Sequence, residues 1–202
     1  VTSIKLLSNF NEIYIVVILS IGILAFSKTF WFQSTSVEVY SLHVLNLNLL
    51  IYFLIRAYFD KNMGFSKYWY FFAIALAASF GNHLTTMLVL PATAYLYFSK
   101  NRFSKAAFVN LAKMIGLFLF VLVLIYSYFP LVASSSPLLN WGNPIDLERI
   151  LRHISGKQYQ VWIFSSFDSA KKQLTYFINN LPKEFGISLA LVLAGVVYTF
   201  LN

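Results

Sequence analysis

The residues best suited to chemistry in this chain are three histidines and one glutamate, because an imidazole or a carboxylate can take a proton from a hydroxyl group. They lie near the ends of apolar segments or in the long polar stretch that follows them, and they are Glu38, His43, His83 and His153. Two cations near the last histidine, Arg152 and Lys157, can bind a phosphate group as it departs. These residue types together indicate proton transfer beside a phosphate-containing substrate, if the fold brings them together.

Each of these residues also has a structural interpretation. Glu38 would stabilise the positive N-terminal end of the helix that follows it, and for a single glutamate this is the more common role. His83 follows a Gly-Asn pair, which is a natural turn sequence. Arg152 and His153 would lie on the wet face of a surface helix. No single residue distinguishes the two interpretations.

Membrane-spanning helices must position these residues. Hydrophobic residues make up 59% of the chain and charged residues only 11%, which is far from the composition of a soluble domain. Six uncharged stretches are the candidate spans: 13–27, 39–55, 68–82, 84–99, 114–133 and 185–202. A span needs roughly 20 residues, so several of these suffice only with their flanking aromatic and lysine side chains. Residues 68–99 could be two spans or a re-entrant pair of half-spans with a bend at His83.

Basic residues predict the orientation of these spans. Alternate connections contain Lys5, Arg56, Lys61, Lys67, Lys100, Arg102, Lys105 and Lys113, whereas the short connections of the opposite side contain only Lys28. The positive-inside rule therefore places the first set in the cytoplasm and 28–38, the turn at 82–83 and 134–184 outside. We expect a five-span bundle over 1–133, an extracytoplasmic loop over 134–185 and the start of a further span over 186–202. Three tryptophans are interpreted as anchors at the membrane surface: Trp31, Trp69 and Trp162.

The outer loop contains two patterns typical of amphipathic helices. In the first, Asn143 is a plausible N-cap, Pro144 takes the first helical position and Gly156 stops the helix. The second begins at Asp168 and ends before Pro182. Such helices would lie on the membrane surface or form the roof of a site that opens to the outside.

Several classes of site are absent from the sequence. There is no cysteine, so neither a disulfide nor a thiolate metal site is possible. No phosphate loop, dinucleotide-binding glycine pattern, zinc-protease motif or nucleophile elbow is present. The net charge of +8 comes from basic residues placed between apolar runs, so we expect no nucleic-acid partner. No signal peptide follows Val1, and the apolar run at Asn202 predicts a piece of a longer protein.

Three short blocks of the sequence resemble one family of membrane enzymes. They are Phe30-Trp31-Phe32 followed by Glu38-Val39-Tyr40-Ser41-Leu42, the turn Ser79-Phe80-Gly81-Asn82-His83-Leu84-Thr85 with Pro91, and Asn140-Trp141-Gly142-Asn143-Pro144 followed by His153 and Tyr159. Their order and spacing over residues 28–165 are similar to those of the transmembrane protein O-mannosyltransferases, whose animal members modify plexin-type receptor domains and which have bacterial relatives. Three blocks in register are more specific than one.

With this resemblance, the expected fold is an all-α membrane protein. It would be a polytopic helix bundle of about six spans, similar to the GT-C glycosyltransferases, with a long extracytoplasmic loop carrying two short amphipathic helices. The resemblance implies transfer of a mannose-like sugar from a polyprenyl- or dolichyl-phosphate carrier to a protein hydroxyl at the extracytoplasmic face. The expected partners are the lipid bilayer, this lipid-linked donor and a protein acceptor, with no further cofactor assigned. The Lys-, Asn-, Ile- and Phe-rich composition is what an AT-rich bacterial genome would give. We therefore expect a multi-pass protein of the bacterial inner membrane, with the site facing the periplasm or exterior.

The resemblance also assigns site residues and shows a departure from the family. The acidic and His-Pro-rich motifs expected near the family's N-terminus are missing, so we expect the main catalytic base outside this chain and no activity from the fragment alone. Glu38 and His83 are the catalytic candidates within it. The substrate-binding candidates are Tyr40, His43, Asn82, Trp141, Asn143, Arg152, His153, Lys157 and Tyr159, and no metal ligand is assigned.

A rival interpretation from another class remains open. A non-catalytic transporter, a lipid-carrier flippase or a membrane scaffold would use the same polar residues as a substrate path or as structural groups. An acidic outer loop encoded upstream of Val1 would favour the transferase, and its absence would favour the rival.

Overall fold

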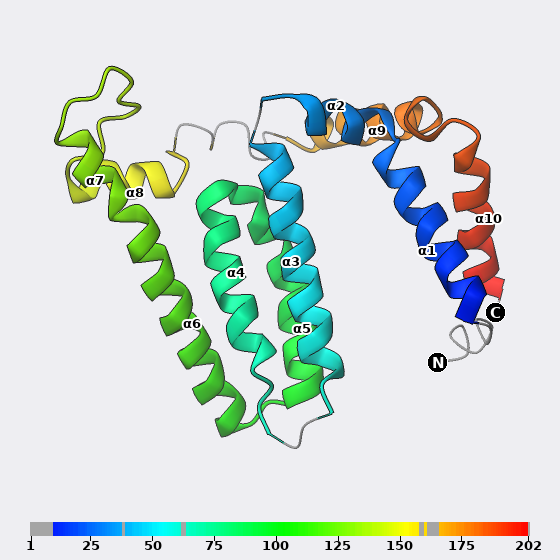
Figure 1. Ribbon diagram of the computed structural model, residues 1–202, viewed down its shortest axis with the longest axis horizontal. Helices are drawn as coiled ribbons and strands as arrows, with labels where there is room; N and C mark the ends of the chain where they lie inside the picture. Colours follow the sequence, from blue (N-terminus) through cyan, green and yellow to red (C-terminus); the bar gives the residue numbers. More distant parts are fainter. Residues whose placement is uncertain (1–9, 38, 62–63, 158–159, 161–165, 202) are drawn as a thin grey trace. The chain divides into compact units, whose positions relative to one another are not determined.

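The computed structural model describes residues 10–37, 39–61, 64–157, 160 and 166–201, and within these residues every regular element is a helix. The expectation of an all-helical chain is confirmed. By its internal contacts the chain divides into two compact units, residues 39–161 and residues 1–38 with 162–202. Figure 1 labels the helices, and each unit is described by itself.

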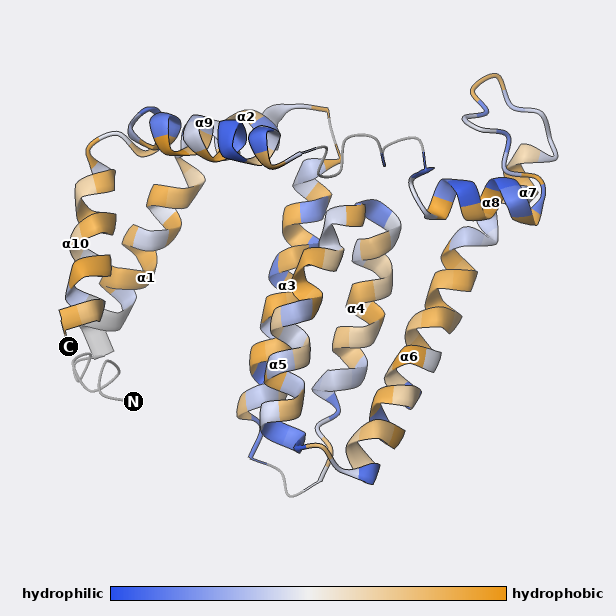
Figure 2. Cartoon of the chain, turned by 180° about the vertical axis from the view of Figure 1, so that it is seen from behind, coloured by the Kyte–Doolittle hydropathy of each residue, from blue (hydrophilic) through white to orange (hydrophobic). Residues whose placement is uncertain are grey.

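The unit 39–161 is built around one central helix. Its elements are α3 (Tyr40–Phe59), α4 (Tyr68–Asn82), the 3-10 helix η1 (Leu84–Val89), α5 (Leu90–Asn101), α6 (Lys105–Tyr126), α7 (Tyr128–Ala133) and α8 (Leu147–Ile154). Helix α4 packs against α3 on one side and α6 on the other. Large apolar side chains of α6, such as Phe120 and Val123, remain exposed, and Figure 2 colours most of this helix orange because its residues are hydrophobic. Such a surface suits a lipid environment.

Aromatic residues of α4 and α5 form the centre of this unit. Trp69 is completely buried, and its ring lies 4.9 Å from that of Tyr97 in an edge-on arrangement. The hydroxyl group of Tyr97 donates a 2.6 Å hydrogen bond to the carbonyl oxygen of Ala107, which joins α5 to the start of α6. The prediction that Trp69 anchors the chain at the membrane surface is therefore wrong, because packing between helices takes up the whole indole ring.

The two ends of the unit 39–161 differ in charge. Helices α3 and α5 end, and α4 and α6 begin, at the same end of the unit (Figure 1). This end carries Arg56, Lys61, Lys67, Lys100, Arg102 and Lys105. The other end carries His43, Asn82 and His83 together with α7 and α8. The cations that mark the cytoplasmic side in the charge-based orientation thus share one end of the helices, although the histidine end also carries Arg149 and Arg152 of α8.

The lengths of the helices bear on membrane crossing. Among the described residues, α3 with 20 residues and Lys105–Ala133 with 29 are long and apolar enough to span a bilayer. Two bent pairs, Tyr14–Ala25 with Lys28–Thr35 and Phe167–Phe185 with Ser188–Tyr198, would raise this number from two to four. Helix α4 has only 15 residues, which is about 22 Å at 1.5 Å per residue. These helices identify a membrane protein, while the count of six spans stays a prediction.

The segment predicted as one span over 84–99 is divided in two. Its first part is η1, and α5 follows with Pro91 in its first turn. Proline has no backbone N–H and its ring crowds the preceding turn of an α-helix, so Pro91 is favoured in the first turn of a helix and disfavoured in the middle of one. The chain therefore reaches α5 through a tighter helix directly after His83.

The unit 1–38 with 162–202 contains α1 (Phe10–Ala25), α2 (Lys28–Thr35), α9 (Phe167–Phe185) and α10 (Ser188–Leu201). Helices α2 and α9 lie side by side (Figure 1). The Glu184 carboxylate accepts hydrogen bonds of 2.7 Å from both the backbone N–H and the hydroxyl group of Thr29 in the first turn of α2. A carboxylate at this position satisfies free N–H groups and complements the helix dipole.

Helix α9 corrects one predicted boundary. The sequence pattern ends the second amphipathic helix before Pro182, but the helix includes Pro182 and runs to Phe185. Gly186 then ends it with a φ of 53°. A proline in the last turn removes a single hydrogen bond, and the remaining contacts of the helix outweigh this loss. This amphipathic helix, with 19 residues, is also longer than predicted.

Candidate functional site

Two histidine rings lie against each other where α3 begins and α4 ends. The ring centroids of His43 and His83 are 4.6 Å apart, and the ring planes are tilted by 31°. His43 belongs to the first turn of α3 and is buried, whereas His83 directly follows α4 and is half-buried. The ring of Tyr40 lies 5.6 Å from that of His83. The structure therefore brings three of the predicted site residues together.

The hydroxyl group of Thr85 joins the two histidines. Its Oγ1 atom is 3.1 Å from Nε2 of His43 and 2.8 Å from Nδ1 of His83. The backbone N–H of Thr85 also donates to Nδ1 of His83, at 3.3 Å. Nδ1 of His43 is buried and has no hydrogen-bond partner among the described residues. Two imidazoles are thus connected through one hydroxyl group.

The turn after α4 positions this cluster. His83 leaves the helix with an extended backbone, φ −152° and ψ 125°, and its side chain caps η1 through Thr85. The side-chain amide of Asn82 donates a 3.3 Å hydrogen bond to the carbonyl oxygen of Val39, which ties the end of α4 to the start of α3. Behind the turn, the hydroxyl groups of Ser79 and Thr86 form a buried 2.7 Å hydrogen bond. Asn82 thus has a structural role in holding the site.

A close contact between α4 and α6 also depends on this segment. A Cβ atom built on Gly81 would lie 3.3 Å from Cγ2 of Ile125. Few real Cβ atoms come so close to a neighbour, and Ile125 is β-branched and stiff around its first side-chain torsion. Glycine at position 81 therefore lets the end of α4, and His83 two residues later, approach α6.

An open groove of about 540 Å³ lies between this turn and α8. Its apolar lining comes from Phe80, Leu84 and Met87 on one side and from Leu151 and Ile154 of α8 on the other. The polar lining consists of Glu148, Arg152, Ser155 and Lys157. An apolar groove bordered by cations can accept a molecule that combines a hydrocarbon chain with a phosphate. The two predicted phosphate ligands, Arg152 and Lys157, both line it.

The cations of the groove differ in their partners. Arg152 donates a 3.0 Å hydrogen bond to Glu148 one helical turn earlier, and both side chains are exposed. An exposed ion pair of this kind is worth little, so Arg152 can turn toward a ligand at small cost. Lys157 is exposed, and no ion pair joins it to any other residue in the described part of the chain. Lys157 is therefore the more available cation.

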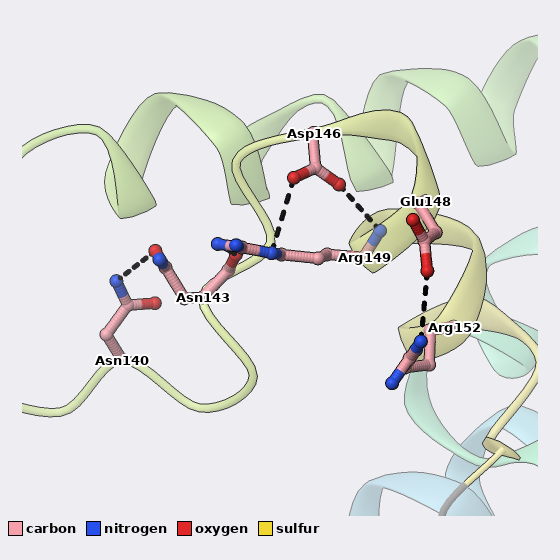
Figure 3. A network of polar contacts seen from close by, with 6 residues as sticks. All are labelled: Asn140, Asn143, Asp146, Glu148, Arg149 and Arg152. Carbon is pink, nitrogen blue, oxygen red and sulfur yellow. Dashed lines mark hydrogen bonds and ion pairs between the residues drawn. The ribbon is translucent and has the colours of Figure 1, made fainter.

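A polar network holds the loop before α8, and Figure 3 shows its residues. The Asp146 carboxylate caps α8 by accepting from the backbone N–H of Arg149 at 2.9 Å, and it also lies 3.3 Å from Nε of that arginine. The prediction that Asn143 is the N-cap is wrong. Asn143 instead adopts a φ of 43°, and its side-chain oxygen accepts a 2.9 Å hydrogen bond from Asn140. Aspartate is as good a cap as asparagine and stands directly before the helical residues.

The remaining predicted residues are not gathered in one place. Trp141 is 71% exposed and, like Asn143, does not line the groove. His153 packs its ring edge-on against Phe129 of α7, with the centroids 4.7 Å apart, so it holds α8 to α7. Glu38 and Tyr159 lie outside the described residues.

Thr85 is the residue that sequence reasoning missed. Threonine is common and uncharged, so it carries little signal by itself. A side chain in a turn often accepts a hydrogen bond from the backbone N–H two residues later, as His83 does from Thr85. This spacing could have pointed to Thr85. Its contact with His43 could not have been found this way, because His43 lies 42 residues earlier in the chain.

Comparison with known proteins gives a family for the chain. Residues 3–107 match the family described as the N-terminal domain of the protein O-mannosyl-transferase TMEM260. This match spans just over half of the chain and includes the first two sequence blocks, with His43, His83 and Thr85, while the groove residues of α8 lie beyond it. No curated protein and no solved structure matches the chain.

The helices of the chain, its apolar outer surface and this match agree with one another. Two to four of the described helices or helix pairs are suited to a membrane. The expected resemblance to the O-mannosyltransferases is confirmed by the family match. The chain belongs to the protein O-mannosyl-transferase TMEM260 N-terminal domain family and is part of a membrane protein of that family.

Proposed function

We propose that the protein transfers a mannose-like sugar from a polyprenyl-phosphate carrier to a hydroxyl group of a protein acceptor. The family's description names an O-mannosyl-transferase, which supports the reaction type. The observation that carries the choice of donor is the groove between the α4–η1 turn and α8. Its apolar residues suit an isoprenoid chain, and Arg152 and Lys157 suit a phosphate.

The histidine pair is connected to this groove through the turn that follows α4. His83 and its neighbour Leu84 belong to the same turn, and Leu84 lines the groove. A phosphate held by Lys157 and Arg152 would have its hydrocarbon chain against Phe80 and Met87. The reacting sugar would then extend toward the end of the unit where His43 and His83 meet.

The chemistry of the transfer needs one base and one leaving group. The acceptor oxygen forms a bond to C1 of the sugar as the bond from C1 to the phosphate oxygen breaks, and the electron pair leaves with the phosphate. The proton of the acceptor hydroxyl passes to a carboxylate, for which Glu38 or a residue outside this chain is the candidate. Cations at the phosphate stabilise the charge that develops there.

The orientation proposed here puts the histidine end at the extracytoplasmic face. The cationic residues at the opposite end of the unit 39–161 support this orientation, because lysine and arginine gather on the cytoplasmic side. The proposal also includes six membrane spans and a location in a bacterial inner membrane. Single cysteines introduced at Lys61 and Leu139 would test the orientation, because the chain has no cysteine of its own. A membrane-impermeant thiol reagent added outside should label position 139 and leave position 61 unlabelled.

A sugar-transfer assay tests the reaction. The full-length protein in lipid nanodiscs is incubated with polyprenyl-phosphate mannose and a pool of serine- and threonine-containing acceptor proteins, and the acceptors are examined by mass spectrometry. Addition of one hexose is expected with the lipid monophosphate donor and not with a nucleotide-linked mannose. Transfer from the nucleotide donor alone would contradict the proposed donor class. Single substitutions to alanine at Glu38, His83, Trp141 and His153 test the site. Near wild-type activity in all four variants would contradict the assignment of these residues to the site.

A further inference from the structure

The contacts of Thr85 determine which nitrogen of His83 carries the proton. A neutral imidazole has one N–H and one nitrogen with a free lone pair. The backbone N–H of Thr85 points at Nδ1 of His83, at an N–N distance of 3.3 Å. A proton on Nδ1 would point at the hydrogen of this amide. Nδ1 is therefore the acceptor, and Nε2 carries the proton of the ring.

The direction of the hydroxyl bonds follows from this tautomer. The Thr85 hydroxyl lies 2.8 Å from Nδ1 of His83 and must donate to it, because two facing lone pairs would repel. Its oxygen is then free to accept from Nε2–H of His43, 3.1 Å away. This leaves the lone pair on Nδ1 of His43, the buried atom that has no partner in the described residues. The three side chains form one directed chain of hydrogen bonds from His43 through Thr85 to His83.

The Nε2–H group of His83 is the free end of this chain. None of the contacts that the structure describes for His83 uses Nε2, and the ring is held on its face by His43 and Tyr40. A proton on Nε2 removes the lone pair that a general base needs. Leu84, the residue after His83, lines the groove, so an N–H on the His83 ring is instead suited to donate to an anionic oxygen of a ligand there.

We propose that Thr85 and His43 hold His83 as the neutral Nε2–H tautomer, which donates a hydrogen bond to an oxygen of the departing lipid phosphate and does not act as the general base. Thr85 and His43 are positioning residues in this arrangement, and His83 is the residue that contacts the substrate. The inference rests on the proposed function and sharpens it, because it leaves proton removal to a carboxylate.

Substitution of His83 by glutamine or by asparagine distinguishes a hydrogen-bond donor at this position from a general base. The amide N–H of glutamine reaches close to the place of ring Nε2, whereas the shorter asparagine places its oxygen near Nδ1 and provides no donor at the position of Nε2. Neither amide can act as a base. We expect His83→Gln to keep kcat/KM for the lipid donor within about tenfold of wild type. His83→Asn should lower it by roughly 10- to 100-fold, which is the range for one hydrogen bond to a charged group. Equal and complete loss in both variants would overturn the proposal.

Substitution of the hydroxyl group tests the role of Thr85. Thr85→Val removes the hydroxyl and keeps the shape, whereas Thr85→Ser keeps the hydroxyl. We expect Thr85→Val to lower kcat/KM for the lipid donor and to leave KM for the protein acceptor unchanged, and Thr85→Ser to restore it. Equal activity in the two variants, or a change in acceptor KM alone, would contradict the positioning role.

Nitrogen-15 NMR of histidine-labelled full-length protein observes the tautomer without any reaction. The His83 signal, assigned by its loss in His83→Gln, should show a protonated Nε2 and an unprotonated Nδ1. Sugar-free polyprenyl phosphate should shift the Nε2 signal, and inorganic phosphate at the same concentration tests whether the phosphate alone suffices. A protonated Nδ1, or no shift with either ligand, would overturn the inference. Absence of sugar transfer by the wild type would instead overturn the proposed function, so the two failures are distinguishable.

Discussion

The ammonium group of Lys100 in α5 donates a 2.6 Å hydrogen bond to the carbonyl oxygen of Ala57 in α3. The same group reaches the carbonyl oxygen of Asp60 at 2.8 Å. The last carbonyl groups of a helix have no partner within the helix and carry partial negative charge, so a lysine is well placed there. Lys100, which the sequence presents as a marker of the cytoplasmic side, therefore also joins two helices.

The first prediction concerns this lysine. Lys100→Met keeps the length of the side chain but leaves both carbonyl groups without their donor. We expect the free energy of unfolding of the full-length protein in mixed micelles to fall by about 1.5–3 kcal/mol, the range for hydrogen bonds to charged groups. Lys113→Met is the matched control, because Lys113 is exposed and forms no ion pair within the described residues. An equal effect of the two substitutions would contradict the role of Lys100.

The second prediction compares two tryptophans of the same unit. Trp69 is completely buried, whereas Trp141 is 71% exposed. Trp69→Ala should lower the free energy of unfolding by about 3–5 kcal/mol, because it leaves a cavity in the centre of the unit. Trp141→Ala should change it by less than about 0.5 kcal/mol. Titration of both variants with SDS in mixed micelles checks this difference, and a small effect of Trp69→Ala would show that the indole is not in the core.

The third prediction concerns the close approach at Gly81. Gly81→Ala adds a methyl group 3.3 Å from Cγ2 of Ile125, so we expect a loss of about 1–3 kcal/mol from overpacking. A Cβ atom at Gly116 would meet no atom within 4 Å, so Gly116→Ala should stabilise α6 by about 0.5–1 kcal/mol. Thermal unfolding of both variants measures the sign of each effect. In the double variant Gly81→Ala with Ile125→Ala, the two losses should be less than additive, and strict additivity would exclude the contact.

The fourth prediction concerns pH and the contact between α2 and α9. Partial burial raises the pKa of the Glu184 carboxyl, but hydrogen bonds from Thr29 and Ser27 and the charge of Lys28 outweigh it, so the pKa lies below its usual value. A lowered pKa stabilises the folded state above the unfolded pKa of about 4.3, and this contribution is lost as the pH falls through the folded value. The difference in melting temperature between wild type and Glu184→Gln should therefore be largest near neutral pH and shrink progressively as the pH falls below the unfolded pKa of about 4.3 toward the lowered folded pKa. A difference that grows on acidification would contradict the contact.

The sequence predicts the helices of this chain better than it predicts the caps and turns that connect them. The boundaries of α4 agree with the predicted stretch 68–82, because Lys67 precedes it and the chain turns into an extended backbone at His83, directly after it. The division of 84–99 at Pro91, and the N-cap at Asp146, depend on which of several suitable residues the fold uses. Local patterns cannot make this choice, because packing between distant segments decides it.

The candidate site was predicted in part for a similar reason. His43, His83 and Tyr40 stood out by residue type, and the structure brings them together. Thr85 did not, since its importance comes from a contact with α3 that spacing in the chain does not show. Trp69 illustrates the opposite error, because a tryptophan near the start of an apolar stretch suggests the membrane surface, although neighbouring helices bury this one. Residue type indicates chemistry, and tertiary contacts decide where that chemistry is used.

The rate of mannose transfer from polyprenyl-phosphate mannose to a protein acceptor, measured for wild type, His83→Asn and Lys113→Met in nanodiscs, tests the central claim most directly. Wild type and Lys113→Met should transfer the sugar at similar rates, and His83→Asn should lose roughly 10- to 100-fold in kcat/KM for the donor. No transfer by the wild type, or equal rates for all three proteins, would contradict a sugar-transfer site at the histidine end of this unit.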